Sequence, residues 1–331
     1  MSNLLYEKIM GCLAGGVIGD AMGAPVENMT YIEIEEKYGT VSDFEGEGTD
    51  DSAIKLILCD AILKHNGTVT ADEFAESFLE SEEKYKHLFY IPVLNMLEKL
   101  KAEVVLPVYA GMGNMQSSSS AMAISPMGII NAGNPARAAA ETFDVAGLIH
   151  AGETTFCRDA ACAMAAAVAQ AMAVGADVDS VLHAATAYLH PKSAMVMKGS
   201  IEEALSYARK YKDYRSFREW FYANRLRTVI SDSRETVPVA LSMFYLAQGD
   251  PVQTILYAVN FGRDTDTIGT MAGALAGAYG GAARIKPEWF GKLQKHNDQS
   301  ILAGQLYDVV LSRLKAEKEH CKLLESMMES V

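Results

Sequence analysis

Aspartate and threonine residues cluster twice in this chain, each time where a glycine-containing turn leads into a helical pattern. The two segments are Thr49-Asp50-Asp51 and Asp264-Thr265-Asp266-Thr267. Both residue types are favoured at helix N-termini, so helix capping is one interpretation of each segment. The presence of two such segments favours a second interpretation, a metal site, because four carboxylates on two facing helix starts would repel one another without a cation. Hard divalent ions such as Mg²⁺ or Mn²⁺ take such carboxylate and hydroxyl oxygens as ligands.

A further acidic residue, Glu27, follows Pro25 at the end of a small-residue helix that also carries Asp20. By itself Glu27 is open to two interpretations, a solvated loop acid or a catalytic carboxylate. The histidines and the five cysteines show no zinc-ligand spacing, so no soft-ligand site competes with the carboxylates.

The elements that would position these acids contain two ridges of glycine. The ridges are Gly11, Gly15, Gly19 and Gly23, and Gly269, Gly273, Gly277 and Gly281. Each glycine inside a helix costs about 0.5 to 1 kcal/mol relative to alanine, so something must offset the loss. Close contact between the two helices would do so and would hold the loops at their ends rigidly, although plain dense packing is also compatible with the pattern.

Helix-forming residues fill most of the chain, and alternating β-branched runs are almost absent, so the sequence predicts an all-α fold. We expect helices over residues 4–22, 52–65, 71–84, 90–101, 125–132, 135–150, 155–174, 177–189, 198–211, 215–226, 234–248, 251–260, 266–280 and 298–326. No linker composition divides the chain, which predicts a single compact domain over residues 1–331.

The net charge of −13 and the scattered basic residues argue against nucleic acid as a partner. The N-terminal segment lacks the pattern of a signal peptide, and the unpaired cysteines suit a reducing compartment, so we expect a cytoplasmic protein. The most membrane-like run, the alanine-rich segment between Asp159 and Asp177, is too weakly apolar to predict a span. The stripe from Ile301 to Met328 closes the core or contacts a second subunit, in which case the protein is a homo-oligomer.

Three motifs together resemble the ADP-ribosylglycohydrolase family. They are GCLAGGVIGDAMGAPVE at residues 11–27, GTDDSAI at 48–54 and NFGRDTDTIGTMAGALAGAYGG at 260–281. The resemblance extends from Tyr6 to about Pro287 and implies an all-α fold of that type around a binuclear centre of two Mg²⁺ or Mn²⁺ ions. The ligands it implies are Thr49, Asp50, Asp51, Asp264, Asp266 and Thr267.

The resemblance also implies catalytic residues and substrate contacts. Glu27 matches the family's mobile acid near the metals, and with Asp50 it is the catalytic candidate. His150 matches a family histidine, for which substrate contact and a buried structural role both remain open. The other predicted substrate-binding residues are Gly113, Asn114, Ser118, Ser119, Ser120 and Arg263. Tyr85, Phe89, Tyr90 and Tyr109 are candidates either for stacking on a base or for the core.

The implied activity is metal-dependent hydrolysis of the N- or O-glycosidic bond at ribose C1 of an ADP-ribosylated substrate. The chain departs from the family where Ser117–Ser120 replace a Gly-Asn-Gly loop, Ala123 replaces an arginine and Arg263 replaces a glycine. These departures leave open a nucleosidase-like hydrolase of a free ribosylated small molecule. A non-catalytic ADP-ribose-binding protein is a further alternative, which the complete acidic set disfavours.

Overall fold

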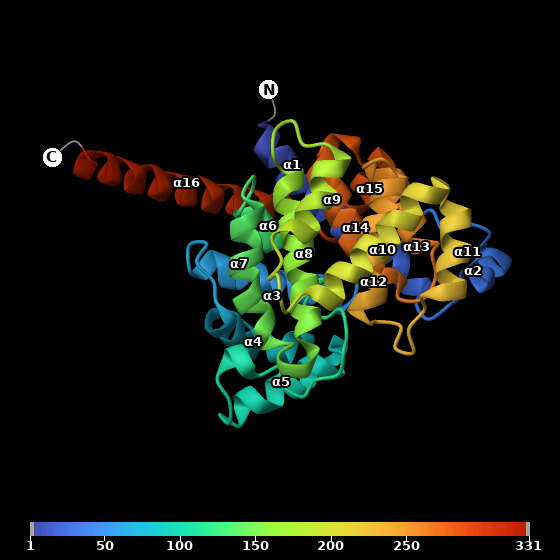
Figure 1. The fold of residues 1–331 in the computed structure, drawn as a ribbon, viewed down its shortest axis with the longest axis horizontal. Helices are drawn as coiled ribbons and strands as arrows, with labels where there is room; N and C mark the ends of the chain where they lie inside the picture. The colour runs from blue at the N-terminus through green and yellow to red at the C-terminus, as the bar shows by residue number, and fades with distance from the viewer. Residues whose placement is uncertain (1–2, 329–331) are drawn as a thin grey trace.

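The computed structural model describes residues 3–328, and these form α-helices joined by short loops and 3-10 turns, with no β-strand among them (Figure 1). The all-α prediction is confirmed. The α-helices are α1 (Leu4–Gly23), α2 (Tyr31–Tyr38), α3 (Asp50–Lys64), α4 (Ala71–Tyr85), α5 (Ile91–Lys101), α6 (Ser125–Ile130), α7 (Pro135–Val145), α8 (Thr155–Ala171), α9 (Val178–Ala187), α10 (Met195–Tyr211), α11 (Tyr214–Asn224), α12 (Ser233–Leu246), α13 (Pro251–Val259), α14 (Thr265–Gly280), α15 (Pro287–His296) and α16 (Ser300–Met328).

The glycine ridges of α1 and α14 face each other, and the two helices run in opposite directions. The facing pairs are Gly11 with Gly277, Gly15 with Gly273, and Gly19 with Gly269. A Cβ atom on any of these residues would overlap backbone atoms of the opposite helix, so the contact requires glycine on both sides. The C-terminal end of α1 therefore lies beside the start of α14, where Thr265 Oγ1 donates a 2.8 Å hydrogen bond to the Gly23 carbonyl.

The predicted helices all fall on observed ones, with their ends shifted by several residues. Two helices among the described residues escaped prediction, α2 and α15, because each is short and mixes aromatic with charged residues. The helix expected over residues 135–150 was too long: α7 ends at Val145, and a 3-10 turn, η4 (Ala146–Leu148), follows it. The backbone tightens at Gly147, which lies against the Val108 carbonyl and the Arg158 guanidinium.

The alanine-rich helix α8 is almost completely buried and packs against α6, α7, α9 and α14. Among the described residues, one helical segment, Leu4–Val26, is long and apolar enough to cross a membrane by length and composition. This segment contains α1, and 89% of its most apolar window is buried inside the protein, as in the core helix of a globular protein. Helix α8 has 17 residues and is buried along almost its whole length, which agrees with its prediction as a core helix and not a span.

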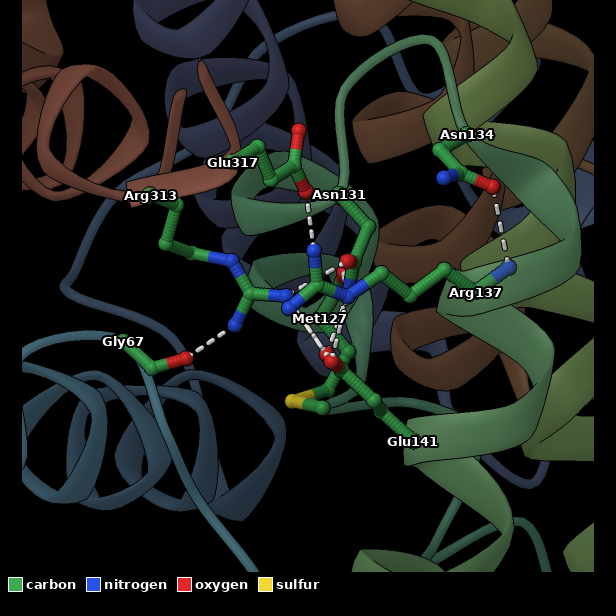
Figure 2. A network of polar contacts seen from close by, with 8 residues as sticks. All are labelled: Gly67, Met127, Asn131, Asn134, Arg137, Glu141, Arg313 and Glu317. Carbon is green, nitrogen blue, oxygen red and sulfur yellow. Dashed lines mark hydrogen bonds and ion pairs between the residues drawn. The ribbon is translucent and has the colours of Figure 1, made fainter. Parts of the chain in front are cut away.

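The last helix, α16, is attached to the body mainly through its first half, with one further ion pair between Glu317 and Arg137 of α7. Ala303, Leu306 and Val309 are buried, and beyond them the helix extends away from the other helices (Figure 1). A polar network fastens it where it leaves: Arg313 donates to the Glu141 carboxylate at 2.8 and 3.0 Å and to Asn131 Oδ1 at 2.8 Å (Figure 2). The N-terminal half of α16 thus completes the core, whereas contact of the other half with a second subunit stays a prediction.

Because of the glycine contact, a Gly→Ala substitution should have opposite effects on the free energy of unfolding in α14 and in α10. Gly273→Ala should lower the free energy of unfolding by about 2 kcal/mol or more, because its methyl group would meet the Gly15 carbonyl. Gly199→Ala, in α10 with open space around its Cβ position, should raise the free energy of unfolding by about 0.5 kcal/mol. Urea titration of both variants measures the difference, and equal stability of the two would disprove the role of the ridge.

Candidate active site

Three helix ends meet at one cavity of about 500 Å³: the C-terminal end of α1 and the starts of α3 and α14. Polar groups from these ends contribute to its lining, together with aromatic, aliphatic and serine side chains. The lining residues are Glu27, Asn28, Gly48, Thr49, Asp50, Asp51, Leu88, Phe89, Tyr90, Ser118, Ser119, Met122, Ile230, Ser231, Asp264, Asp266 and Thr267. The structure thus brings the two predicted acidic segments and Glu27 to a single place.

Asp20 joins the end of α1 to the start of α3. Its buried carboxylate accepts hydrogen bonds from the backbone N–H groups of Thr49 and Ser52, both at 3.0 Å, and from both of their hydroxyls. These bonds replace the missing backbone acceptors at the first turn of α3 and fix its direction. We did not assign Asp20 a role from the sequence, although its place beside the glycine ridge was a usable signal.

Capping accounts for only part of the predicted ligand set. Thr49 is the N-cap of α3, and its hydroxyl accepts from the Asp51 N–H at 3.3 Å. Asp51 is buried, and one of its oxygens accepts from Thr267 Oγ1 at 3.3 Å, which links α3 to α14. Asp264 occupies the N-cap position of α14, yet its side chain accepts no capping hydrogen bond. Most of the carboxylates at these helix starts are therefore not explained by capping.

Glu27, Asp264 and Asp266 form the tightest carboxylate cluster, with ligand oxygens from all three within 4.8 Å of one another. The backbone holds the two loops together: the Asn28 N–H donates to the Arg263 carbonyl at 2.8 Å, and the Arg263 N–H donates to the Met29 carbonyl at 2.6 Å. This pairing carries the Glu27 carboxylate to the start of α14.

The donor set fits a divalent cation. Asp51 Oδ1, Asp264 Oδ2 and Asp266 Oδ1 are buried and have no hydrogen-bond partner among the described residues. Buried carboxylate oxygens without partners are costly, and a hard cation would satisfy all three. The acidic cluster is therefore able to bind a metal ion.

The same crowding raises the pKa values of the acids. Burial is the main cause, and repulsion from Asp20 adds to it at Asp50, whose pKa rises to about 7. The pKa of Asp264 also rises to about 7, through burial and the charge of Glu27. The pKa values of Asp51 and Asp266 lie well above the usual range for the same reasons. Glu27 is exposed as a residue, but its carboxyl group enters the cavity, and partial burial raises its pKa.

Of the predicted substrate contacts, Ser118 and Ser119 line the cavity, whereas Ser120, Asn114 and His150 lie behind it. Asn114 Nδ2 donates to two backbone carbonyls. His150 is buried between serines, with Nδ1 2.6 Å from Ser120 Oγ, and burial lowers its pKa to about 3. The neutral imidazole thus braces the serine loop, residues 117–120, from behind.

Arg263 and Gly113 also lie outside the cavity lining. Arg263 adopts a left-handed backbone with φ of 74°, and its guanidinium pairs with buried Glu235, at 2.8 Å from Nε to Oε1. The ion pair holds this guanidinium at Glu235, outside the cavity lining, and its contact with a substrate stays a prediction. Gly113 is exposed on a turn with φ of 76°.

The cavity lining also includes two of the aromatic stacking candidates and several residues that were not predicted. Phe89 and Tyr90 reach the lining, whereas Tyr85 and Tyr109, suggested on the same grounds, do not. Leu88, Met122, Ile230 and Ser231 also contribute, from loops that carry no chemical motif. Ser118 Oγ donates to the Ser231 carbonyl at 2.9 Å, so the segment before α12 and the serine loop form one wall. Only tertiary contact assembles this wall.

The raised pKa values predict how stability without metal depends on pH. A carboxyl group with a higher pKa in the folded state binds its proton more tightly there, so its contribution is largest at low pH and is lost as pH rises through about 7. In EDTA, we expect the melting temperature to fall from about pH 5.5 to about pH 8, and saturating Mn²⁺ to reduce the fall. Calorimetry measures both.

The control for this prediction is the double variant Asp50→Asn, Asp264→Asn, which lacks the two groups that titrate near pH 7. Its melting temperature in EDTA should depend less on pH. A wild-type melting temperature that rises over the same range would contradict the assignment.

Comparison with known proteins agrees with this geometry. The ADP-ribosylglycohydrolase family model matches residues 1–316. The uncharacterized protein YegU of Escherichia coli (strain K12) is 28% identical over 95% of this chain and 98% of YegU, and the ADP-ribosylhydrolase ARH3 of Gallus gallus is 24% identical over 93% and 94%. A solved ADP-ribosylglycohydrolase-related protein complex has the same fold, with a TM-score of 0.70, 22% identity and coverage of 92% and 99%. The chain belongs to the ADP-ribosylglycohydrolase family.

Proposed function

We propose that the protein is a metal-dependent glycosidase that hydrolyses the N- or O-glycosidic bond at ribose C1 of an ADP-ribosylated substrate. The observation that carries this proposal is the placement of the Glu27, Asp264 and Asp266 carboxylates within 4.8 Å of one another in a 500 Å³ cavity. Membership of a family of hydrolases that act on ADP-ribose glycosidic bonds supports the reaction class.

The resident metal would be two Mg²⁺ or Mn²⁺ ions, held by Thr49, Asp50, Asp51, Asp264, Asp266 and Thr267. Bound ions of this kind polarise water and chelate vicinal hydroxyls such as those of a ribose. The unpartnered oxygens of Asp51, Asp264 and Asp266 support this ligand set.

Side chains of the protein would supply proton transfer and substrate contacts. Glu27, at the edge of the cavity, is placed to take a proton from an attacking water, and its raised pKa moves it toward neutral pH, where a general base is most effective. Asp50 also lines the cavity, one residue before buried Asp51. The rings of Phe89 and Tyr90 provide a surface for a base or another flat group.

A second candidate function is hydrolysis of a free ribosylated small molecule. Among the described residues, the cavity wall has no lysine, arginine or histidine to meet a diphosphate. Its uncharged polar side chains on the far side are those of Ser118, Ser119 and Ser231, and Arg263 is held away by Glu235. This composition favours a substrate with fewer phosphates.

One panel of assays tests both candidates. The substrates are ADP-ribosyl-arginine protein, ADP-ribosyl-serine peptide, ADP-ribose derivatives and simple nucleosides, each with Mg²⁺, Mn²⁺ or EDTA. Release of ADP-ribose from protein or peptide only with metal supports the first proposal. Cleavage of small ribosides alone supports the second, and turnover that survives exhaustive chelation disproves the metal role in both.

Two substitutions should separate catalysis from metal binding. Glu27→Gln should lower kcat about 100-fold or more while Mn²⁺ still raises the melting temperature, because the proton acceptor is lost while Asp264, Asp266 and the other proposed ligands remain. Asp266→Ala should abolish turnover and the Mn²⁺-induced rise together. Exposed Glu36→Gln on α2 is the control and should leave both unchanged. Full activity in Glu27→Gln would remove Glu27 from the mechanism.

A further inference from the structure

Lys55 is a lysine inside the core, close behind the acidic site. It lies on α3 one helical turn after Asp51, and only 2% of its surface is exposed. Its Nζ atom has no hydrogen-bond partner among the described residues, and none of their carboxylates lies within ion-pair distance. A buried ammonium group in such a position is costly unless other charges in the protein compensate for it.

The α1 helix makes room for this ammonium group at Gly16. Gly16 is not on the ridge of facing glycines: a Cβ atom there would lie 3.4 Å from the Ala274 side chain of α14, whereas its shortest contact would be with Lys55. A Cβ atom on Gly16 would lie 2.7 Å from Lys55 Nζ, closer than real Cβ contacts come. Glycine at this position is therefore matched to the long side chain on α3.

The negative charge that balances Lys55 comes from the acidic site, because its other titratable neighbours are uncharged. The nearby thiols of Cys12 and Cys59 are neutral, since burial raises the pKa of each to about 12. Burial likewise raises the pKa values of Asp20 and Asp51, and the positive charge of Lys55 opposes that rise at both. The ammonium group, which is not part of the cavity lining, thus acts on Asp20 of α1 and on Asp51 in the first turn of α3.

We propose that Lys55 is a fixed counter-ion of the acidic site, which stabilises the fold before divalent ions bind and weakens the binding of those ions. The proposal rests on the metal site of the proposed function. Without metal, the carboxylates repel one another, and one built-in positive charge offsets part of that repulsion. With metal bound, the same charge repels the ions, so affinity is lower than the carboxylates alone would give.

The test uses Lys55→Met in the full chain, with Lys64→Met as control on the exposed part of the same helix. Mn²⁺ alone is the probe: calorimetric titration gives its Kd, and thermal unfolding gives the melting temperature in EDTA and in Mn²⁺. Lys55→Met should bind Mn²⁺ at least about tenfold more tightly than wild type. It should also melt at a lower temperature in EDTA, and Mn²⁺ should restore most of the loss. Lys64→Met should change neither quantity.

The outcomes separate this proposal from the metal site itself. Wild-type protein that binds no Mn²⁺ would disprove the site and the role of Lys55 with it. Wild-type binding with an unchanged or weaker affinity in Lys55→Met would disprove only the counter-ion role. Failure of Lys55→Met to fold in both EDTA and Mn²⁺ would also overturn the proposal, because it would make Lys55 a packing residue.

Gly16→Ala provides an independent check on the fit between the two helices. In wild type the added methyl group displaces the ammonium group, so the melting temperature in EDTA should fall. In the Lys55→Met background the shorter side chain leaves space, and the same change should have a smaller effect. Equal losses in the two backgrounds would show that Gly16 and Lys55 are not coupled and would overturn the matched-pair argument.

Discussion

The backbones of α1 and α14 touch along a ridge where neither helix carries a side chain, and the position of the site depends on this contact. Because the helices run antiparallel in a single register, the end of one must lie beside the start of the other. That geometry carries Asp20 and Glu27 to Asp264 and Asp266. Gly11, Gly15 and their partners each lower the helix propensity of the chain. Their lack of side chains allows the close contact that fixes the distance between the two helices.

The site is electrostatically strained by the same contact. Several carboxylates lie where helix dipoles favour negative charge, yet burial and mutual repulsion raise their pKa values toward neutrality. Asp20 is fully hydrogen-bonded and holds α3, whereas Asp51, Asp264 and Asp266 each keep an unpartnered oxygen. Structural and ligand-binding carboxylates are thus distinguished by their hydrogen bonds, although all of them lie at helix ends.

The far wall of the cavity is built on another principle. Ser118 and Ser119 reach the cavity from a loop that His150 supports from behind and that Ser231 and Ser233 tie to the start of α12. Because the imidazole is buried and neutral, it can hold hydroxyl groups without adding charge. The wall therefore combines a hydrogen-bonded serine loop with the rings of Phe89 and Tyr90.

The sequence by itself determined the all-α class, the family and the convergence of the acidic segments, because helix periodicity, glycine spacing and acids at helix starts are local patterns. It left open whether the two glycine ridges meet or only reflect dense packing, and the structure shows that they meet. Only the tertiary structure decided which side chains face the cavity. Arg263 carries the positive charge that a phosphate contact needs, but its guanidinium forms an ion pair with Glu235, which is distant in the sequence. Likewise, nothing local to Lys55 or Gly16 shows that α1 and α3 bring them together, since contacts between helices depend on how distant segments pack.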